Sequence, residues 1–158
     1  MAYWMWRVSV VVVATVVPSS AWAQRAPQED PVSVVEAFVQ ANERADLELI
    51  VSTFDETAIL FPPGDRPQRA TGKAEIRAFF EGTFGQRRGP ITITPRDVHV
   101  QQLGDIAVVT AHLGPLPALP VSEPTTFSRR TFVVKRVGSR WVIVHLHASN
   151  LQLSPPRQ

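Results

Sequence analysis

The sequence predicts an α+β fold in which N-terminal helices pack on one face of an antiparallel sheet. Two observations predict it. Apolar residues recur at three- and four-residue spacing through much of the first half of the chain, which is the pattern of helices. In the second half, apolar and polar residues alternate and short glycine-containing turns interrupt the alternation, as in hairpins. Helices followed by a run of neighbouring strands are typical of the α+β class.

Three helices are expected. The first opens at Pro31, since a proline in the first turn lacks an N–H that would have no helical partner anyway. Asp46 is expected to cap a second, short helix over 47–53. The third begins after Gly72 and ends near Gly85. The inward-facing stripes of these helices comprise Val32, Val35, Phe38, Val39, Leu49, Ile50, Ile76, Phe79 and Phe80.

Five strands are expected, and two tight turns help to place them. Gly104-Asp105 and Gly138-Ser139 have the composition of two-residue hairpin loops. A chain of 158 residues accommodates one domain of ordinary size. The expected strands are 54–61, 91–102, 106–113, 125–136 and 141–151.

The N-terminal segment has the organisation of a cleavable signal peptide. Arg7 precedes a valine-rich apolar run, and Ala21-Trp22-Ala23 supplies the small-x-small pattern at which signal peptides are cleaved. The run is about half the ~20 residues that a membrane-spanning helix needs, so no membrane anchor is expected after cleavage. We therefore expect a secreted or periplasmic protein. The expected organisation is 1–23 signal peptide, 24–31 flexible mature N-terminus, 32–151 folded domain and 152–158 loose tail.

Composition excludes several kinds of chemistry. The chain has no cysteine, which excludes disulfides, thiol catalysis and thiolate metal sites. The formal net charge is only +2, and the basic residues occur as scattered pairs without interleaved aromatic residues. This pattern argues against a nucleic-acid partner. No cofactor is expected either.

The strand "RWVIVHLHASN" places His145 and His147 on one face. If Gly138-Ser139 is a two-residue loop, regular pairing sets Phe132 opposite His145 and Arg130 opposite His147. That face is then a pocket wall, favoured by Arg130, or a subunit interface, favoured by its apolar residues. It would carry Arg130, Phe132, Val134, Trp141, Ile143, His145 and His147, with Thr131, Val133, Val142, Val144 and Leu146 on the other face.

The same arithmetic applies to the other two histidines. At Gly104-Asp105 it pairs His99 with Thr110 and Asp97 with His112, on the mixed face of the sheet. Asp97 and His112 would form an orienting pair for a general base or a surface ion pair. The two hairpins are too far apart for four histidines to converge on one ion, so no metal site is expected.

Three motifs carry a family resemblance. They are "G-x-x-x-I-x-x-F" (Gly72, Ile76, Phe79), "G-D-x-A" (Gly104, Asp105, Ala107) and "W-x-x-V-H-x-H-x-S" (Trp141, Val144, His145, His147, Ser149). Together they resemble the SnoaL-like branch of the nuclear transport factor 2-like superfamily, which has a cystatin-like cone fold. The third motif is similar to the calcium/calmodulin-dependent kinase II association domain.

The resemblance implies a curved antiparallel sheet wrapped around N-terminal helices, a modest pocket and a homodimer. It implies no single chemistry, because the fold hosts isomerases, dehydratases and members that only bind or assemble. The steroid isomerases of this superfamily use an essential tyrosine, whereas the only tyrosine here is Tyr3, within the expected signal peptide.

These observations leave three functional hypotheses. In the first, an exported domain binds a small anionic or carbonyl-bearing molecule between helix and sheet. Its polar contacts would be Arg130, His145 and His147, and its apolar wall Phe38, Phe61 and Phe80. The second is a non-catalytic homo-oligomerisation module. The third is a histidine-based isomerase or lyase, so the sequence leaves open whether the protein is an enzyme.

Overall fold

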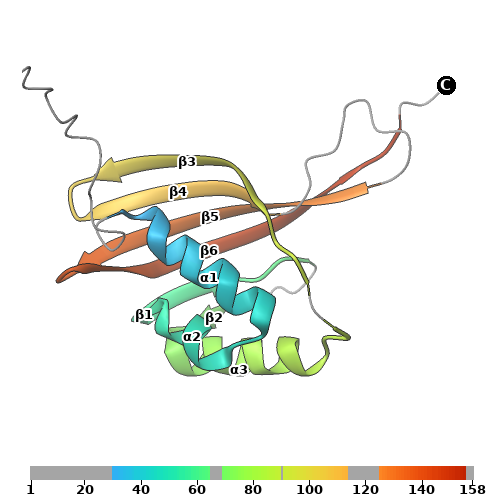
Figure 1. Ribbon diagram of the computed structural model, residues 1–158, viewed down its shortest axis with the longest axis horizontal. Helices are drawn as coiled ribbons and strands as arrows, with labels where there is room; N and C mark the ends of the chain where they lie inside the picture. Colours follow the sequence, from blue (N-terminus) through green and yellow to red (C-terminus); the bar gives the residue numbers. More distant parts are fainter. Residues whose placement is uncertain (1–29, 65–68, 90, 114–124, 156–158) are drawn as a thin grey trace, which may run out of the picture.

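The computed structural model describes residues 30–64, 69–89, 91–113 and 125–155. The described residues form three helices and six strands. They follow one another in the order that the sequence predicts, with one additional short strand before the third helix (Figure 1). The helices are α1 (Val32–Arg44), α2 (Leu47–Ser52) and α3 (Gly72–Gly85). The strands are β1 (Phe54–Phe61), β2 (Ala70–Thr71), β3 (Pro95–Leu103), β4 (Ile106–Leu113), β5 (Thr125–Val137) and β6 (Arg140–Leu153).

The first two helices meet at a sharp corner that the local sequence explains. Ala45 ends α1 in the left-handed conformation, with φ 54°, and its N–H bonds back to carbonyl oxygens of the last helical turn. Asp46 then caps α2 as predicted, because its carboxylate accepts a hydrogen bond from the Leu49 N–H at 2.9 Å. The corner sets α2 beside α1, and β1 begins directly after α2.

The strands form one six-stranded sheet in the order β2-β1-β6-β5-β4-β3. The run from β3 to β6 is the antiparallel meander expected from the sequence, whereas β1 pairs with β6 in parallel. Gly104 and Gly138 adopt φ values of 66° and 62° in the two tight turns, a conformation that glycine enters without a Cβ clash. The predicted fold class is therefore confirmed.

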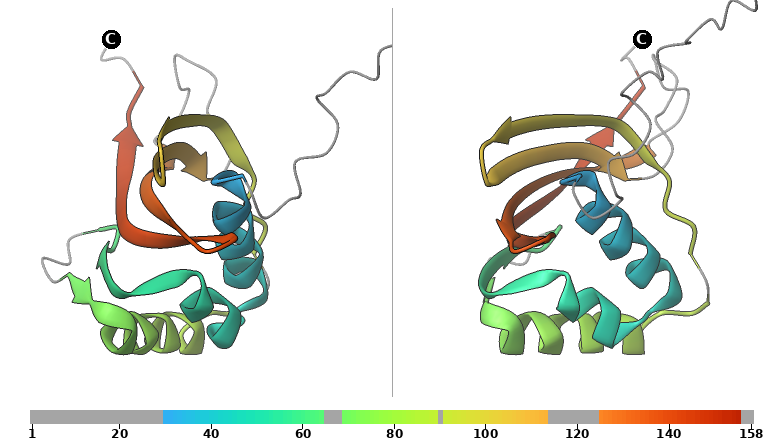
Figure 2. Two further views of the ribbon diagram at one scale, coloured as in Figure 1. Left: turned by 90° about the vertical axis from the view of Figure 1, so that its left-hand side faces the viewer. Right: turned by 60° about the vertical axis from the view of Figure 1, so that its left-hand side comes forward.

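The sheet curves around α1, and in both views of Figure 2 the pair β3–β4 arches over the helix. We call the side that faces the helices the inner face and the opposite side the outer face. The middle of the inner face is packed with aromatic rings. Phe38 of α1 meets Phe132 of β5 edge-on, with ring centroids 5.4 Å apart, and also contacts Phe54 and Phe80 at 6.0 Å each. Each such pair adds roughly 0.5–1.5 kcal/mol beyond the burial of apolar surface.

The register of the β5–β6 hairpin departs from the prediction after its first few residues. Arg136 pairs with Trp141 as expected, but β6 carries one extra residue, Val144, between the pairs Val134–Ile143 and Val133–His145. This β-bulge moves every later residue of β6 by one position. The predicted pairs Phe132–His145 and Arg130–His147 are therefore wrong.

The bulge decides which side chains share a face. Phe132 pairs with Leu146 and Arg130 with Ala148, while His145 and His147 pair with Val133 and Thr131. Phe132, Leu146 and Ala148 are buried, so their side is the inner face. Leu146, predicted on the face opposite Phe132, is thus an inner-face residue, and the two histidines lie on the outer face.

The β3–β4 hairpin is closer to the prediction. His99 pairs with Thr110 and Gln101 with Val108, as expected, but a second bulge near Asp97 places Arg96, not Asp97, opposite His112. Asp97 takes a φ of 50° there, which explains how the chain absorbs the extra residue.

The observed strand boundaries differ from the predicted ones at the ends of the long strands. The strand predicted from residue 91 begins at Pro95, and β6 continues to Leu153, so the first residues of the predicted tail are part of the sheet. The predicted signal peptide, and the mature N-terminus up to residue 29, lie outside the described residues. In the part of the chain that the structure describes, no helix is both long and apolar enough to cross a membrane.

Candidate functional site

The inner face changes character beyond Phe132, toward the N-terminal end of β5. Arg130 follows Phe132 on the same face, between Ala111 of β4 and Ala148 of β6. Both alanines are buried, and their small side chains leave the long arginine side chain room to lie against the sheet. The strand pattern thus places a guanidinium group at the edge of an aromatic core.

Burial controls the electrostatics of Arg130. Loss of solvent lowers its pKa from the ordinary 12.5 to about 10, so the group stays charged at neutral pH. Its one hydrogen bond to a described residue runs from Nη1 to the backbone oxygen of Arg129, at 3.0 Å. Within residues 30–64, 69–89, 91–113 and 125–155, no carboxylate pairs with it.

Two polar side chains stand one ladder step beyond Arg130. Ser128 pairs with both Leu113 and Asn150, and Leu113 packs against the core, which places this set on the inner face. The Ser128 hydroxyl donates a hydrogen bond to Oδ1 of Asn150 at 3.1 Å. Sequence reasoning missed both residues, although the two-residue spacing of Ser128 from Arg130 was a usable signal for Ser128.

The inner face is not fully covered on its β3 side. Val100 pairs with Val109, which is fully buried, yet Val100 itself is 36% exposed. An apolar side chain on the inner face therefore meets solvent, because α1 covers the centre of the sheet and not its β3 edge. Val109 in turn pairs with Phe132, so this apolar surface lies on the same face as Arg130 but two strands away from it.

The structure separates the six predicted site residues into two groups. Phe38 and Phe80 belong to the inner side with Arg130, but they are 3% and 4% exposed and form part of the core. They pack in the aromatic core next to Phe132, and do not form the accessible wall that the sequence suggested.

Phe61, His145 and His147 form the second group, on the outer face. The Phe61 ring lies 5.7 Å from the His145 ring and 6.2 Å from the His147 ring. Phe61 is 38% exposed, and His147 is also exposed. These three side chains cannot share a ligand with Arg130, because the sheet lies between them.

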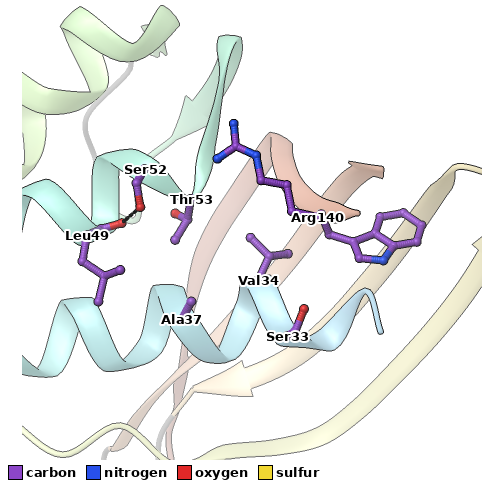
Figure 3. Close-up of a pocket in the computed structure, with 8 residues that line it drawn as sticks. Ser33, Val34, Ala37, Leu49, Ser52, Thr53 and Arg140 are labelled. Atoms are coloured by element: carbon purple, nitrogen blue, oxygen red, sulfur yellow. Dashed lines mark hydrogen bonds between the residues drawn. The ribbon is translucent and has the colours of Figure 1, made fainter. Parts of the chain in front are cut away.

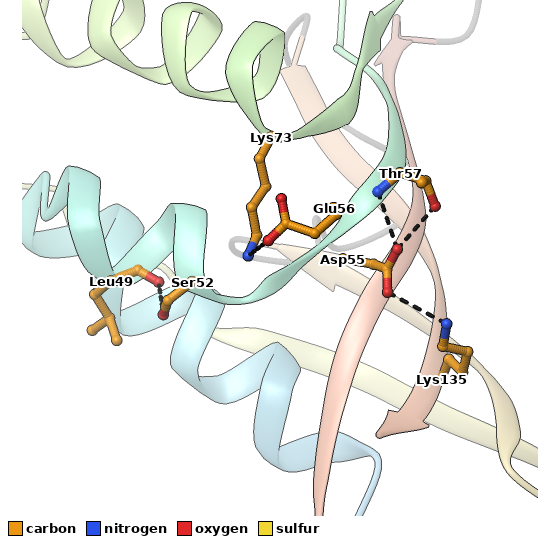
Figure 4. A network of polar contacts seen from close by, with 7 residues as sticks. All are labelled: Leu49, Ser52, Asp55, Glu56, Thr57, Lys73 and Lys135. Atoms are coloured by element: carbon orange, nitrogen blue, oxygen red, sulfur yellow. Dashed lines mark hydrogen bonds and ion pairs between the residues drawn. The ribbon is translucent and has the colours of Figure 1, made fainter. Parts of the chain in front are cut away.

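On the same outer face, a polar network links β1 to β5 across β6 (Figure 4). Asp55 accepts hydrogen bonds from the Thr57 N–H and hydroxyl at 3.0 and 2.9 Å, and lies 3.4 Å from Lys135 Nζ. The hydrogen bonds from Thr57, with a smaller contribution from Lys135, hold the pKa of Asp55 below its ordinary value. The opposite charges of Asp55 and Lys135 compensate each other, as expected of a contact that stabilises the fold.

His112 and Asp97 meet as predicted, through the bulge and not through direct pairing. Nδ1 of His112 lies 3.5 Å from Oδ2 of Asp97, whose side chain is largely exposed, and the His112 ring packs on Phe127. This is a side-chain contact across two strands, and Nδ1 of His112 is buried there without a hydrogen bond to a described residue. His112 pairs with Arg129 and His99 with Thr110, so both lie on the outer face with His145 and His147. All four histidines are therefore outside the inner face.

The described residues also form a groove of about 330 Å³ on the flank of α1 (Figure 3). It contains none of the six predicted site residues. No cluster of three or more potential metal ligands occurs within the described residues. The groove is lined by Ser33, Val34, Ala37, Leu49, Ser52, Thr53, Arg140 and Trp141.

Comparison with known proteins identifies a family over most of the chain. Residues 32–153 match the model of the SnoaL-like domain. No curated protein matches the chain. Many solved structures do, and they confirm the nuclear transport factor 2-like fold that the motifs predicted.

Three solved structures illustrate the likeness. An NTF2-like protein of unknown function from Pseudomonas putida is 24% identical, with a TM-score of 0.61 over 73% of this chain and 80% of its own. A proposed calcium/calmodulin-dependent protein kinase type II association domain from Thiobacillus denitrificans is 23% identical, with a TM-score of 0.62 over 79% and 98%. A ketosteroid isomerase-like protein from Erwinia carotovora atroseptica is 20% identical, with a TM-score of 0.60 over 75% and 92%. At these identities the likeness establishes the fold alone.

Proposed function

This chain belongs to the SnoaL-like domain family, and within that fold we propose that it binds a small carboxylate-bearing molecule at Arg130. The observation that carries the proposal is the partly buried guanidinium on the inner face, which has no carboxylate partner among the described residues. A buried charge is costly unless it is paired. An anionic ligand would supply the missing partner.

The chemistry of arginine defines the ligand group. A guanidinium is planar and offers five N–H donors, which match the two oxygens of a carboxylate. Such charge-assisted pairs are among the strongest hydrogen bonds in proteins.

The geometry favours binding over turnover. A histidine-based isomerase or lyase needs its base within hydrogen-bond reach of the substrate. All four histidines of the chain lie on the outer face, so none faces a ligand held at Arg130. The signal-peptide pattern of residues 1–23 supports the further proposal that this binding occurs outside the cytoplasm.

Calorimetric titration of the purified protein with valerate tests the proposal, with the neutral amide valeramide as the control probe. Valerate should bind and valeramide should not. Arg130→Met should weaken valerate binding by about 10- to 100-fold, the loss expected for a charge-assisted hydrogen bond. Arg129→Met is the matched control, because Arg129 is its exposed neighbour on the outer face.

Two results would refute the binding proposal. One is valerate affinity that is equal in Arg130→Met and in the wild type. The other is a wild-type protein that binds no carboxylate.

We also propose a second role, self-association as a homodimer through the outer face. The exposed Phe61, set between two histidine rings, forms an amphipathic patch there. Sedimentation velocity of Phe61→Glu should show monomers, whereas Leu103→Glu, at a more exposed apolar residue on β3, should leave the dimer intact. A wild-type monomer, or a Phe61→Glu dimer, would refute this role.

A further inference from the structure

The hydrogen-bonding capacity beside Arg130 specifies more of the ligand than its charge, and this inference rests on the proposed function. The Arg130 guanidinium bonds the carbonyl oxygen of Arg129, the residue between it and Ser128. Its charged end is therefore drawn along the strand toward the Ser128–Asn150 pair, and away from the aromatic core at Phe132. The three polar side chains lie at the same end of the inner face.

The Ser128–Asn150 hydrogen bond leaves an imbalance of donors and acceptors. The Ser128 hydroxyl donates to Oδ1 of Asn150, which occupies one of the two lone pairs of the amide oxygen. The amide nitrogen of Asn150 keeps two N–H donors, neither bonded to a described residue. Arg130 adds further donors, since only one of its five N–H groups bonds a described residue and a guanidinium accepts none. The site thus offers donors at two points.

We propose that the ligand of this site carries a carboxylate for Arg130 and, a short chain away, a second acceptor group for the Asn150 amide. Dicarboxylates and keto acids of a few carbons have this chemistry. Arg130 and Asn150 are a diagonal pair on neighbouring strands, for which a separation of about 7–8 Å is typical, and this sets the scale of the spacing between the two groups. Ser128 is a positioning residue: by bonding the amide oxygen, it holds the amide nitrogen toward the ligand.

Three five-carbon probes, titrated calorimetrically into the purified protein, test this inference. Glutarate has a carboxylate at both ends, valerate at one end, and 5-aminovalerate has a carboxylate and an ammonium group. Glutarate should bind about tenfold more tightly than valerate, the gain expected for a second charge-assisted hydrogen bond. 5-Aminovalerate should bind more weakly than valerate, because its ammonium group would meet the N–H donors of Asn150, to which it cannot act as an acceptor.

Variants at Asn150 separate recognition from folding. Asn150 is exposed near the end of β6, so its substitution should leave the thermal midpoint nearly unchanged. Asn150→Leu should remove the preference for glutarate and preserve valerate binding. Asn150→Asp replaces two donors by a negative charge and should invert the order, so that 5-aminovalerate binds more tightly than glutarate. A residue with only a structural role would not produce this inversion.

Matched serine variants test the positioning role. Ser128→Ala should reduce the preference of the protein for glutarate over valerate, because the amide is then free to rotate. Ser149→Ala, on the outer face of the neighbouring strand, should leave this preference unchanged.

The outcomes distinguish this inference from the function on which it rests. If valerate binding depends on Arg130 but glutarate binds no more tightly, or if Asn150→Asp leaves the order of the probes unchanged, the second acceptor is wrong and the carboxylate site stands. If no probe binds to the wild-type protein, both are wrong.

Discussion

The two faces of the β5–β6 hairpin differ in whether a positively charged side chain lies near a carboxylate. Lys135 lies on the outer face and has Asp55 3.4 Å away, within a network that also includes Thr57. Arg130, on the inner face of the same strand, is partly buried and has no carboxylate beside it among the described residues. A charge that supports the fold is placed with its counterion. The inner-face charge lacks one, which is the arrangement expected of a binding site.

The largest effect that the comparison predicts concerns two adjacent residues, Leu146 and His145. Leu146→Asp would place an unpaired carboxylate in the core, at a cost comparable to the whole stability of a small domain, so this variant should not fold. His145→Asp, on the outer face, should change the free energy of unfolding by less than about 1 kcal/mol. Circular dichroism with urea denaturation measures both. The register without a bulge predicts the reverse order, and that result would overturn the assignment of faces.

A smaller effect of the same kind is expected for Phe132 and Val133 on β5. Phe132→Ala removes a fully buried ring from the aromatic cluster and should cost about 3–5 kcal/mol. Val133→Ala alters a half-buried outer-face residue and should cost about 1 kcal/mol or less. Equal losses in urea denaturation would show that the outer face is also packed against something in the free protein.

The smallest effect concerns the compensated charge of the outer face. Asp55→Asn should lower the free energy of unfolding at pH 7 by about 0.5–1 kcal/mol, because it weakens the contacts with Thr57 and Lys135. The pKa of Asp55 is lowered in the folded protein, so its contribution is complete above the ordinary value of 3.8. The difference between wild type and variant should disappear as the pH falls through the lowered pKa. A difference that persisted at low pH would assign it to packing.

The sequence predicted the fold well because hydrophobic period and tight turns are local signals. Gly104 and Gly138 fixed both hairpins, and the first pairs beyond each turn were correct. The candidate site was predicted less well, because one extra residue, Val144, reversed the faces of all that followed. Nothing local marks that bulge, since Val144 is an ordinary strand residue in an apolar run. The predicted site kept Arg130 but joined it to two histidines that the sheet separates from it.

The two site residues that the prediction missed, Ser128 and Asn150, can be found by the same alternation of faces. Once the bulge is included, alternation from Arg130 and Ala148 leads directly to Ser128 and Asn150. Phe38 and Phe80 were predicted correctly as inward-facing. Their complete burial depends on contacts between α1, α3 and the sheet, which no local pattern encodes.

Thermal unfolding of ligand-free Arg130→Met at pH 7 is the most direct test that this charge is placed for binding and not for stability. Removal of the desolvated charge should raise the melting temperature by about 2–6 °C, while Arg129→Met should leave it nearly unchanged. Because burial lowers the pKa of Arg130, the wild-type protein should regain stability relative to the variant as the pH rises above about 10. A melting temperature of Arg130→Met below that of the wild type at pH 7 would show that the guanidinium supports the fold, and would contradict the account.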